Sequence, residues 1–525
     1  MLCDRGVELR DQNGRIYEGV AVVGAGVSGL TVAHDLVRVG YKVTVFEADD
    51  EPGGMTRVGV PVYRLPRDLV RAEIDAILSL GVELRLNTRV GTDITIPQMR
   101  AQGFKAVLLA AGLQRGRNLS IPGSELDGVV HGIDFLKQVN MGESVAPGRK
   151  VVVIGGGNVA FDVARSAVRV PGAYRADAHD FYEAADSSRM ALRSGAKEVH
   201  LVCLESRAEM PADEIEIHEG VEEGVVLHTS RGPLEILGSN GKVTGLATRR
   251  VKSVFDATGR FNPTFEEEPG EIIPADTVML SIGQSIDDAF VKDVPELKVT
   301  RGIIEIDAAT KRTSVPDIFA CGDVAEGAKL FINAVASGQR AAVSIDEYLR
   351  GLELREDREG TMSFPMPEHV MAEGYLQLDR VNPNALPAAE RASSQKLVEL
   401  NFEEGVAREQ GARCLKCHIN TIFNGDACVL CNGCVDVCPT YCLALVPLSQ
   451  IALEPRLEAA LVARYGVDVR ELREREGHEA VKRLGSVMLK DEELCIRCGY
   501  CAKRCPTGAV TMEHFSYTQQ FSMVP

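Results

Sequence analysis

The sequence lacks a long apolar run, a leader and an excess of positive charge. None of its apolar runs reaches the roughly 18 residues that a transmembrane helix needs. The first segment, residues 1–19, is charged and has no apolar signal core, so we expect no secretory leader. The net charge is −17 and no dense Lys/Arg stripe occurs, which argues against nucleic acid as a partner. Together these absences predict a soluble, cytoplasmic protein without a membrane span.

Cysteine is scarce in the first 400 residues and crowded after them. Of 14 cysteines, only Cys3, Cys203 and Cys321 lie before residue 400, and we expect these three to be plain buried or surface thiols. A disulfide scaffold would not concentrate thiols in one part of a large leaderless chain, so we expect metal or cluster ligation in a reducing compartment. No CxxC precedes Cys414, which argues against a thioredoxin-reductase-like disulfide reductase.

Composition divides the 525 residues into three regimes, which agrees with roughly 100–200 residues per domain. From about 18 to 352, short Val/Ile/Leu runs alternate with helical patterns and Gly-rich turns, which is typical of βαβ units around parallel sheets. Residues 353–400 are polar and dotted with proline, and predict a linker over the surface. Residues 401–525 carry the clustered cysteines.

A first dinucleotide site is predicted early in the chain. Gly24, Gly26 and Gly29 follow a strand and open a helix. The first glycine permits a tight turn, the second lets backbone N–H groups approach a pyrophosphate, and the third lets helix and strand pack closely. Glu47 ends the next strand, where an acid accepts a ribose hydroxyl. A later strand run, 104–112, ends in small residues that leave room for a flat cofactor.

A second strand, glycine-rich turn and helix begins at about residue 150. Gly155, Gly157 and Ala160 form the GxGxxA variant of the same motif. After an insertion at 171–195, the next strand ends at Glu205, which would bind both adenosine ribose hydroxyls of NAD and repel the 2′-phosphate of NADP, an effect that Arg207 would partly offset. We therefore favour NAD(H). The residues predicted at this site are Gly155, Gly157, Asn158, Val159, Ala160, Glu205, Arg207 and Gly283.

The cysteine-rich tail contains one motif twice. Cys428 begins C-x2-C-x2-C-x3-C-P, and Cys495 begins the second copy. At this spacing three thiolates bind one [4Fe–4S] cluster and the fourth crosses to the other cluster, whereas zinc prefers two CxxC pairs at longer separation. The predicted ligands are Cys428, Cys431, Cys434 and Cys505 for cluster one, and Cys495, Cys498, Cys501 and Cys438 for cluster two.

Other parts of the tail have less specific patterns. An insertion at about 445–490 has helical periodicity, which predicts an arm that docks a partner or covers the domain. Within it, arginines 470–475 alternate with Glu and predict a solvated helix face. Cys414, Cys417 and Cys442 are left over: they form either a further metal or redox site or, as we favour, a short buried turn.

The whole chain resembles the glutamate synthase small-subunit-like NAD(P)H oxidoreductases, in a version with a C-terminal 2[4Fe–4S] ferredoxin domain. The resemblance implies FAD at the first site, NAD(P)H at the second, and the isoalloxazine near Gly54, Met55, Val60 and Pro61. The segments that match are GAGVSGL, PGGMTRVGVPVYRLPRDLV, AAGLQRGRNLSIPG, VVVIGGGNVAFDVARSAVR, ESRAEMPADE, IGQS, ACGDVAEG and EQGARCLKC. The predicted FAD residues are Gly24, Gly26, Gly29, Glu47, Gly54, Met55, Val60, Pro61, Ala111, Gly112, Gly322 and Asp323.

The chain also departs from the family pattern. NADPH-specific members tend to have paired arginines where this chain has Leu204, Glu205 and Ser206, which again favours NAD(H). Glutamate synthase carries its cysteines ahead of the flavin domain, whereas here they follow it, and the chain has no amidotransferase segment. These differences make glutamate synthesis an unfavoured alternative.

The predicted fold class is α/β, with two Rossmann-like dinucleotide-binding domains and an α+β bacterial-ferredoxin-like domain. The expected boundaries are an N-terminal extension 1–17, a discontinuous FAD domain 18–120 and 285–352, an NAD(P) domain 121–284, a linker 353–400, and a ferredoxin-like domain 401–525.

The predicted function is that of an electron-transfer subunit in a heteromeric redox enzyme. Hydride would pass between NAD(H) and FAD, and single electrons would pass through two [4Fe–4S] clusters to or from a partner, such as a 2-oxoacid:ferredoxin oxidoreductase, another anaerobic enzyme or a soluble ferredoxin. Since the cofactors carry this chemistry, no catalytic acid–base pair is expected. The alternatives are a flavin-based electron-bifurcating subunit, an NADPH-dependent glutamate synthase small-subunit-type reductase, and a non-enzymatic wire subunit.

Overall fold

The computed structural model describes residues 19–143, 145–169, 196–256, 259–287, 289–354, 361–366, 369, 378–412, 419–451, 458–459, 461–463 and 466–517. The extension 1–17, the insertion 171–195, Cys3, Cys414 and Cys417 lie outside these ranges. The chain forms two compact units. The described residues of unit 1 lie up to Asp357 and in Asn384–Leu400, and those of unit 2 lie in Arg358–Pro383 and Asn401–Gln520.

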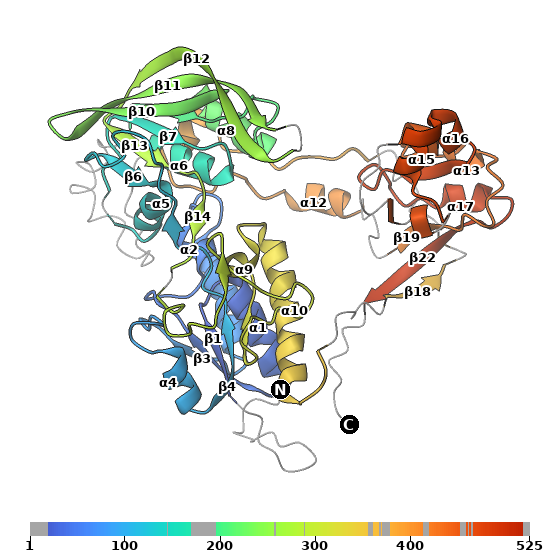
Figure 1. Cartoon of the computed structure of the whole chain (residues 1–525), viewed down its shortest axis with the longest axis horizontal. Helices are drawn as coiled ribbons and strands as arrows, with labels where there is room; N and C mark the ends of the chain where they lie inside the picture. The colour runs from blue at the N-terminus through green and yellow to red at the C-terminus, as the bar shows by residue number, and fades with distance from the viewer. Residues whose placement is uncertain are drawn as a thin grey trace. The chain divides into compact units, whose positions relative to one another are not determined.

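The first lobe of unit 1 is built on a parallel five-stranded sheet of order β17-β4-β1-β2-β3. Its strands read as continuous apolar runs because both faces are covered. Helices α1, α3 and α10 cover one face, and α1 and α10 run side by side in Figure 1. The bounds are β1 Gly19–Val23, α1 Val27–Arg38, β2 Lys42–Phe46, α3 Arg67–Leu78, β3 Glu83–Arg85, α4 Ile96–Ala101, β4 Phe104–Leu109, β17 Ile318–Ala320 and α10 Phe331–Leu349.

The second lobe repeats this design with sheet order β6-β13-β7-β8-β9, again parallel. Helices α5, α6 and α8 pack on one face, and the antiparallel sheet β10-β11-β12 packs on the other. The bounds are β6 Val129–His131, α5 Gly132–Asn140, β7 Lys150–Ile154, α6 Asn158–Val168, β8 Glu198–Val202, α8 Glu214–Glu222, β9 Val225–His228, β10 Arg231–Ser239, β11 Lys242–Phe255, β12 Phe261–Pro274 and β13 Thr277–Leu280.

Shorter elements connect these sheets, while α11 lies in the Asn384–Leu400 part of unit 1 and α12 lies in unit 2. They are α2 Met55–Val58, β5 Arg115–Gly116, β14 Gln284–Ser285, β15 Val299–Thr300, β16 Ile303–Ile304, α9 Asp323–Glu326, α11 Ala388–Arg391 and α12 Glu404–Gly411.

Unit 2 combines a three-stranded antiparallel sheet, β18-β22-β19, with a β20–β21 pair and two short helices. Part of the stretch expected as linker is therefore strand β18. Its alternating Thr-Met-Ser-Phe pattern fits an edge strand, but the prolines around it hid this in the sequence. The bounds are β18 Thr361–Pro365, β19 Ile419–Phe423, α13 Gly433–Asp436, β20 Leu443–Pro447, β21 Ser486–Lys490, α17 Tyr500–Arg504 and β22 Val510–Tyr517.

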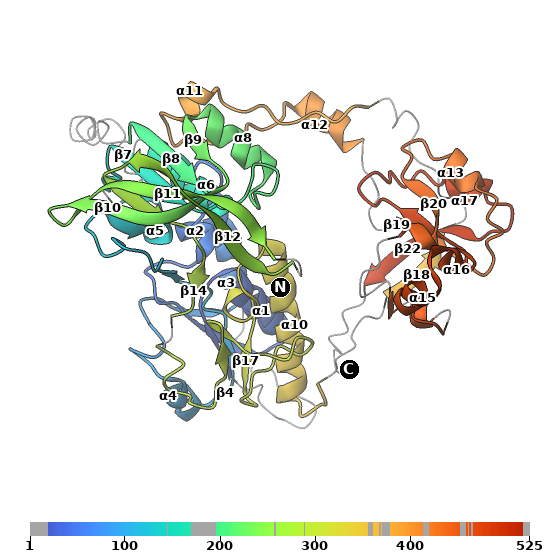
Figure 2. The same cartoon turned by 45° about the horizontal axis from the view of Figure 1, so that its top comes forward.

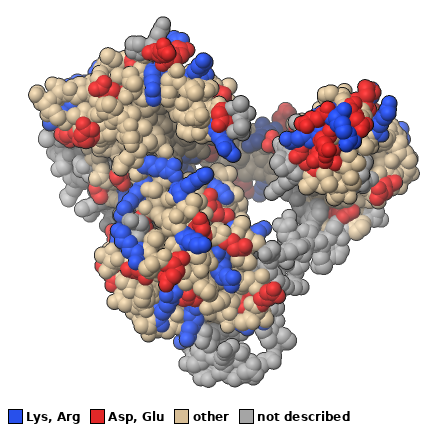
Figure 3. Space-filling model, in the orientation of Figure 1, with Lys and Arg blue, Asp and Glu red and all other residues tan. Residues whose placement is uncertain are grey.

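The inserted arm lies between β20 and β21 and has its own small core. This core consists of Leu448, Leu461, Val469 and Val481, contributed in part by η2 (Leu448–Gln450), α15 (Val469–Glu476) and α16 (His478–Lys482). Acidic and basic side chains interleave over α15 and α16 in Figure 3, as the alternating sequence predicted. Within the described ranges, no helix is both long enough and apolar enough to cross a membrane.

Candidate functional site

The turn between β1 and α1 depends on two close backbone approaches. Gly24 has φ +102°, and a Cβ on Gly29 would lie 2.0 Å from the carbonyl oxygen of Gly24. Only glycine at position 29 therefore lets the helix start directly on the strand end. Gly26 caps the helix and lines a cavity. The N-terminal end of α1, which attracts anions, thus opens toward that cavity.

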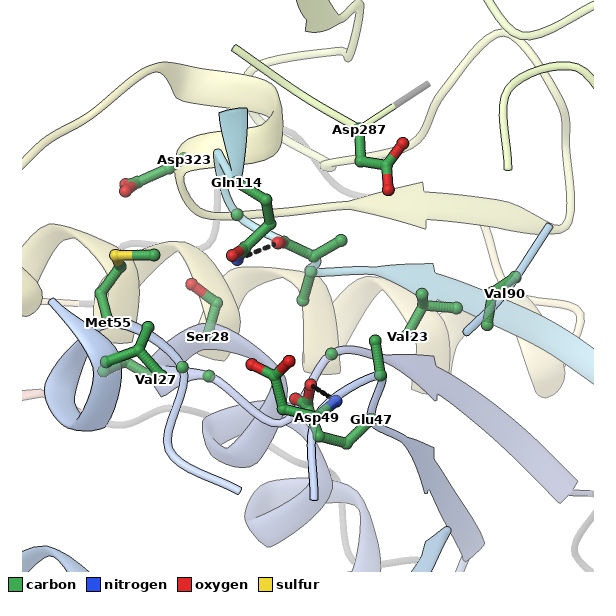
Figure 4. A pocket seen from close by; sticks show the side chains of 18 of the residues that line it. Val23, Val27, Ser28, Glu47, Asp49, Met55, Val90, Gln114, Asp287 and Asp323 are labelled. Atoms are coloured by element: carbon green, nitrogen blue, oxygen red, sulfur yellow. Dashed lines mark hydrogen bonds between the residues drawn. The ribbon is translucent and has the colours of Figure 1, made fainter. Parts of the chain in front are cut away.

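Glu47 lies beside this turn and is held by two backbone groups. The Ala25 N–H donates to its Oε2 at 2.7 Å and the Asp49 N–H donates to its Oε1 at 3.0 Å, the second of which is drawn in Figure 4. Burial raises the pKa of Glu47, and these N–H donors oppose that rise. The carboxylate is therefore fixed at the cavity wall, where its remaining lone pairs can accept a ribose hydroxyl.

The cavity has a volume of about 430 Å³ and lies at the carboxyl ends of β1, β2 and β4. It therefore occupies the place where open α/β sheets bind ligands. Eight of the predicted FAD residues line it: Gly24, Gly26, Glu47, Gly54, Met55, Ala111, Gly112 and Asp323. The other four, Gly29, Val60, Pro61 and Gly322, are described residues outside its lining.

Residues outside the cavity lining support it from behind. Gly29 packs helix on strand, and the Gly322 N–H donates to Ser337 Oγ at 3.1 Å. A Cβ on Gly322 would lie 2.2 Å from Ser28 Oγ. Gly322 therefore shapes the loop that presents Asp323 to the cavity.

Several lining residues were not predicted from the sequence. Lys137 of α5 reaches across from the second lobe, and its Nζ lies 2.7 Å from Asp49 of the first lobe. Gln114 also lines the cavity and donates to the Ala111 carbonyl at 2.9 Å (Figure 4). No local signal marks Lys137, because its partner is 88 residues away. The cavity thus has a fixed carboxylate, a helix N-terminus and walls from both lobes, a donor set that fits a dinucleotide such as FAD.

The second glycine turn, between β7 and α6, has the same construction. A Cβ on Gly155 would lie 2.4 Å from the Ser281 carbonyl oxygen, and Ala160 is fully buried. Gly157 caps α6, and a Cβ on it would meet no atom within 4 Å. The Asn158 side chain accepts from the Asp213 N–H at 2.8 Å, while Val159 is exposed. This turn leaves open space beside Gly157 for a phosphate.

Glu205 points at this turn. Its Oε2 would lie 2.7 Å from a Cβ on Gly156, so the carboxylate lies directly against the glycine loop. Arg207 lies on the surface and is engaged by Glu214, with one contact of 3.0 Å. Gly283 has φ +107° and its carbonyl accepts from Arg117 N–H at 3.0 Å. The structure thus brings Glu205 to the predicted nucleotide loop and pairs Arg207 with an acid.

In unit 2 one small cavity is lined by Cys438, Cys495, Cys498 and Cys501. These are the four thiols predicted for cluster two, three from one motif and the fourth from the other. Cys442, which the sequence left without a role, lines the same cavity. Its sulfur lies 3.4 Å from Cys438 Sγ, and its N–H donates to that sulfur at 3.3 Å. Its spacing of four residues from Cys438 was the signal available.

The thiols predicted for cluster one are more exposed. Cys434 is buried, Cys428 and Cys505 are half-buried, and Cys431 is exposed. Cys434 and Cys505 pack in the same small core as Cys438, Cys442, Cys495 and Cys501. Among the described residues, no three His, Cys, Asp or Glu side chains are arranged to hold a single metal ion. The spacing of the two motifs and the cavity shared by Cys438, Cys495, Cys498 and Cys501 are the features that favour cluster ligation.

The two described thiols of unit 1, Cys203 and Cys321, are buried, and burial makes them unreactive. Burial raises the pKa of Cys203 and of Cys321 to about 12. A thiol with so high a pKa forms almost no thiolate near neutral pH. This agrees with the prediction that both are plain thiols, although Cys321 also contributes to the lining of the large cavity.

Both units contain a segment that matches a known protein family. Residues 18–338 match the family described as "Pyridine nucleotide-disulphide oxidoreductase", and residues 488–511 match "4Fe-4S binding domain". The NADP(+)-dependent formate dehydrogenase subunit beta of Moorella thermoacetica is 37% identical over 76% of this chain and 54% of that protein. The NADPH-Fe(3+) oxidoreductase subunit beta of Geobacter sulfurreducens is 34% identical over 76% of this chain and 61% of that protein. The glutamate synthase (NADPH) small chain of Azospirillum brasilense is 32% identical over 66% of this chain and 69% of that protein. The chain thus spans little more than half the length of the first two relatives.

Among solved structures, FprA of Mycobacterium tuberculosis in complex with NADPH superposes with a TM-score of 0.54 at 21% identity, over 64% of this chain and 85% of that chain. This likeness concerns the fold. Together with the two family matches it confirms the predicted fold class, two dinucleotide-type domains followed by a ferredoxin-like domain, and the family resemblance seen in the sequence.

Proposed function

Since the chain belongs to the pyridine nucleotide-disulphide oxidoreductase family, which its residues 18–338 match, we propose that it exchanges hydride between NAD(H) and FAD and passes electrons through two [4Fe–4S] clusters to or from a partner subunit. The observation that carries the proposal is the large cavity between a glycine turn, a buried acid and the second lobe. Bound FAD would supply the conversion between two-electron and one-electron transfer, and the clusters would carry single electrons.

The chain's own residues would bind and orient these groups. Glu47, held by two N–H donors, would accept from the FAD ribose, and the N-terminus of α1 would face the pyrophosphate. Asp323 and Met55 line the cavity further along, where the ribityl and ring portions would lie. Lys137 and Asp49 close one side across the two lobes, which would exclude water from the cofactor.

NAD(H) is the proposed nucleotide. The Glu205 carboxylate lies against the glycine loop, where it would accept both ribose hydroxyls and repel a 2′-phosphate at close range. Arg207, which would otherwise favour that phosphate, is paired with Glu214. The three relatives named above carry NADP or NADPH in their names, and the proposed preference for NADH sets this chain apart from them.

The partner is proposed to be another redox subunit. Two of the relatives are named as beta subunits, and a cluster domain at the end of a flavin-type reductase is a suitable exit for single electrons. Electron bifurcation and a glutamate synthase role are the alternatives, and no contact or cavity among the described residues favours either of them.

The test is anaerobic purification with flavin and iron analysis, followed by viologen reduction with NADH and with NADPH. We expect one FAD and about eight irons per chain, and a preference for NADH. A preparation without flavin, or with far fewer irons, would contradict the cofactor assignment. A strong preference for NADPH would contradict the role given to Glu205 but leave the cofactor assignment intact.

A further inference from the structure

Residues 384–400 form a closed loop that belongs to unit 1, although the stretches on both sides of it belong to unit 2. The Leu400 N–H donates to the Asn384 carbonyl at 2.7 Å, and the Leu386 N–H donates to the Val398 carbonyl at 2.9 Å. These bonds join the two ends of the segment, which we call the clasp. Helix α11 lies within it and ends at Arg391, beside α8 and β9 in Figure 2.

The clasp contacts the first lobe at Tyr63. The buried Val398 donates its N–H to the Tyr63 carbonyl at 2.9 Å. Tyr63 is fully buried, and the Arg169 guanidinium lies 3.6 Å from the centre of its ring. The loop that carries Tyr63 directly follows α2, which contributes Met55 to the large cavity. A shift of this loop would therefore move a wall of the proposed flavin site.

The clasp contacts the second lobe through Arg391, which is 4% exposed. Its guanidinium pairs with Glu222, and lies 3.5 Å from both Glu219 and Glu223. These three acids come from α8 and its C-terminal end. Glu223 is also bound by Arg165 of α6. The clasp is thus anchored to α8 and, through Glu223, to α6, which are two of the three helices that pack on one face of the second parallel sheet.

A direct bridge between the lobes lies next to these contacts. Arg64, one residue after Tyr63, donates to Asp162 of α6 at 2.7 Å and lies 2.6 Å from Glu216 of α8. One connected network of charges therefore joins the first lobe, the second lobe and the clasp. Buried ion pairs of this kind have strict geometry and resist rearrangement, because separating them leaves an uncompensated charge.

We propose that the clasp is a positioning element for hydride transfer, and that Arg391 is the positioning residue through which it fixes the orientation of the second lobe on the first. This inference rests on the proposed function. Hydride transfer requires the reacting atoms to approach within about 3–3.5 Å, and a misplacement of about 1 Å can slow a reaction about 100-fold. A network that locks two nucleotide-binding lobes together supplies this precision without touching either cofactor.

The test is Arg391→Met in the full-length chain, with Lys396→Met as the matched control. Lys396 is a second clasp cation that pairs with Glu390 of the clasp itself, and its side chain is 69% exposed. Flavin reduction by NADH is followed anaerobically by stopped flow over a range of concentrations. For R391M we expect the limiting rate to fall by about 10- to 100-fold, the apparent Kd for NADH to stay within about twofold, and the long-wavelength absorbance of stacked nicotinamide and flavin to weaken. K396M should match the parent chain.

Arg391→Lys should restore part of the rate, because it keeps the charge but loses the forked donor geometry. If R391M does not retain flavin, Glu222→Gln is the milder variant, since Glu222 is 42% exposed; it should lower the limiting rate several-fold with the same unchanged Kd. A wild-type limiting rate and absorbance in R391M, or in E222Q where R391M does not retain flavin, would overturn the clasp proposal. Failure of NADH and NADPH to reduce the parent chain would instead overturn the proposed function.

Discussion

At the scale of single residues, the position of Glu205 bears on which nucleotide binds. Glu205 ends up against Gly156 because strand β8 pairs in parallel with β7, which brings their carboxyl ends to the same edge. Glu198 lies at the opposite end of β8, paired with Lys150 at 3.0 Å. An acid that begins β8 and an acid that follows it therefore have different expected roles: Glu205 recognises a ribose, and Glu198 forms a surface ion pair.

Replacing Glu205 by Gln should make the chain more tolerant of NADPH. Loss of the charge removes the repulsion of the 2′-phosphate and weakens the hold on the ribose hydroxyls of NADH. We expect the ratio of kcat/KM for NADPH to that for NADH to rise by about tenfold, equivalent to about 1.4 kcal/mol. Steady-state viologen assays measure it. Glu198→Gln is the control and should leave the ratio unchanged; an equal effect of both variants would contradict the assignment.

At the scale of elements, α6 and α8 are joined by buried charges as well as apolar packing. Glu223, which follows α8, has a fully buried side chain and binds Arg165 at 2.9 Å and Arg169 at 2.9 Å. Burial by itself would raise the pKa of Glu223, but hydrogen bonds and charges from the two arginines hold it below the usual value. Its contribution to stability is therefore complete above the unfolded pKa of 4.5 and is lost as pH falls through the folded pKa.

Glu223→Gln should destabilise the chain by about 3–5 kcal/mol at pH 7, because it removes the carboxylate that binds the fully buried Arg169 and one of the three carboxylates that bind Arg165. The free energy of unfolding is measured by urea titration with far-UV circular dichroism. Glu214→Gln, on the exposed side of α8, removes only a surface ion pair with Arg207 and should leave the urea midpoint close to that of the parent chain, because exposed ion pairs add little stability. Similar midpoints for both variants would show that the buried network adds no stability.

At the scale of the whole molecule, the chain joins a nucleotide-binding unit to a thiol-rich unit, and each can be tested separately. The thiols of one predicted cluster come together from motifs more than fifty residues apart in sequence. Cys442 lies among them, so proximity alone does not tell a ligand from a neighbour.

Cys438→Ser should remove one cluster, about four irons per chain, and leave the flavin content and its reduction by NADH unchanged. Viologen or partner reduction should fall, because the electron path is interrupted. Cys442→Ser is the comparison and should keep the full iron content. Iron analysis and electron paramagnetic resonance of the reduced protein distinguish them. If C442S lost iron and C438S kept its full iron content, Cys442 would be the cluster ligand and Cys438 its neighbour.

The sequence alone determined the elements that short patterns mark: two strand–glycine–helix turns, the acid at or just after the strand that follows each turn, and two cysteine motifs. Each pattern consists of residues that are adjacent along the chain or belong to the next strand. Tertiary structure alone decided which distant groups meet. Lys137 reaching Asp49, Arg64 reaching Asp162, and the clasp anchored by Arg391 join residues 88 to 169 positions apart. No periodicity or spacing in the sequence predicts such contacts, because they form only when the sheets, the helices and the clasp pack together.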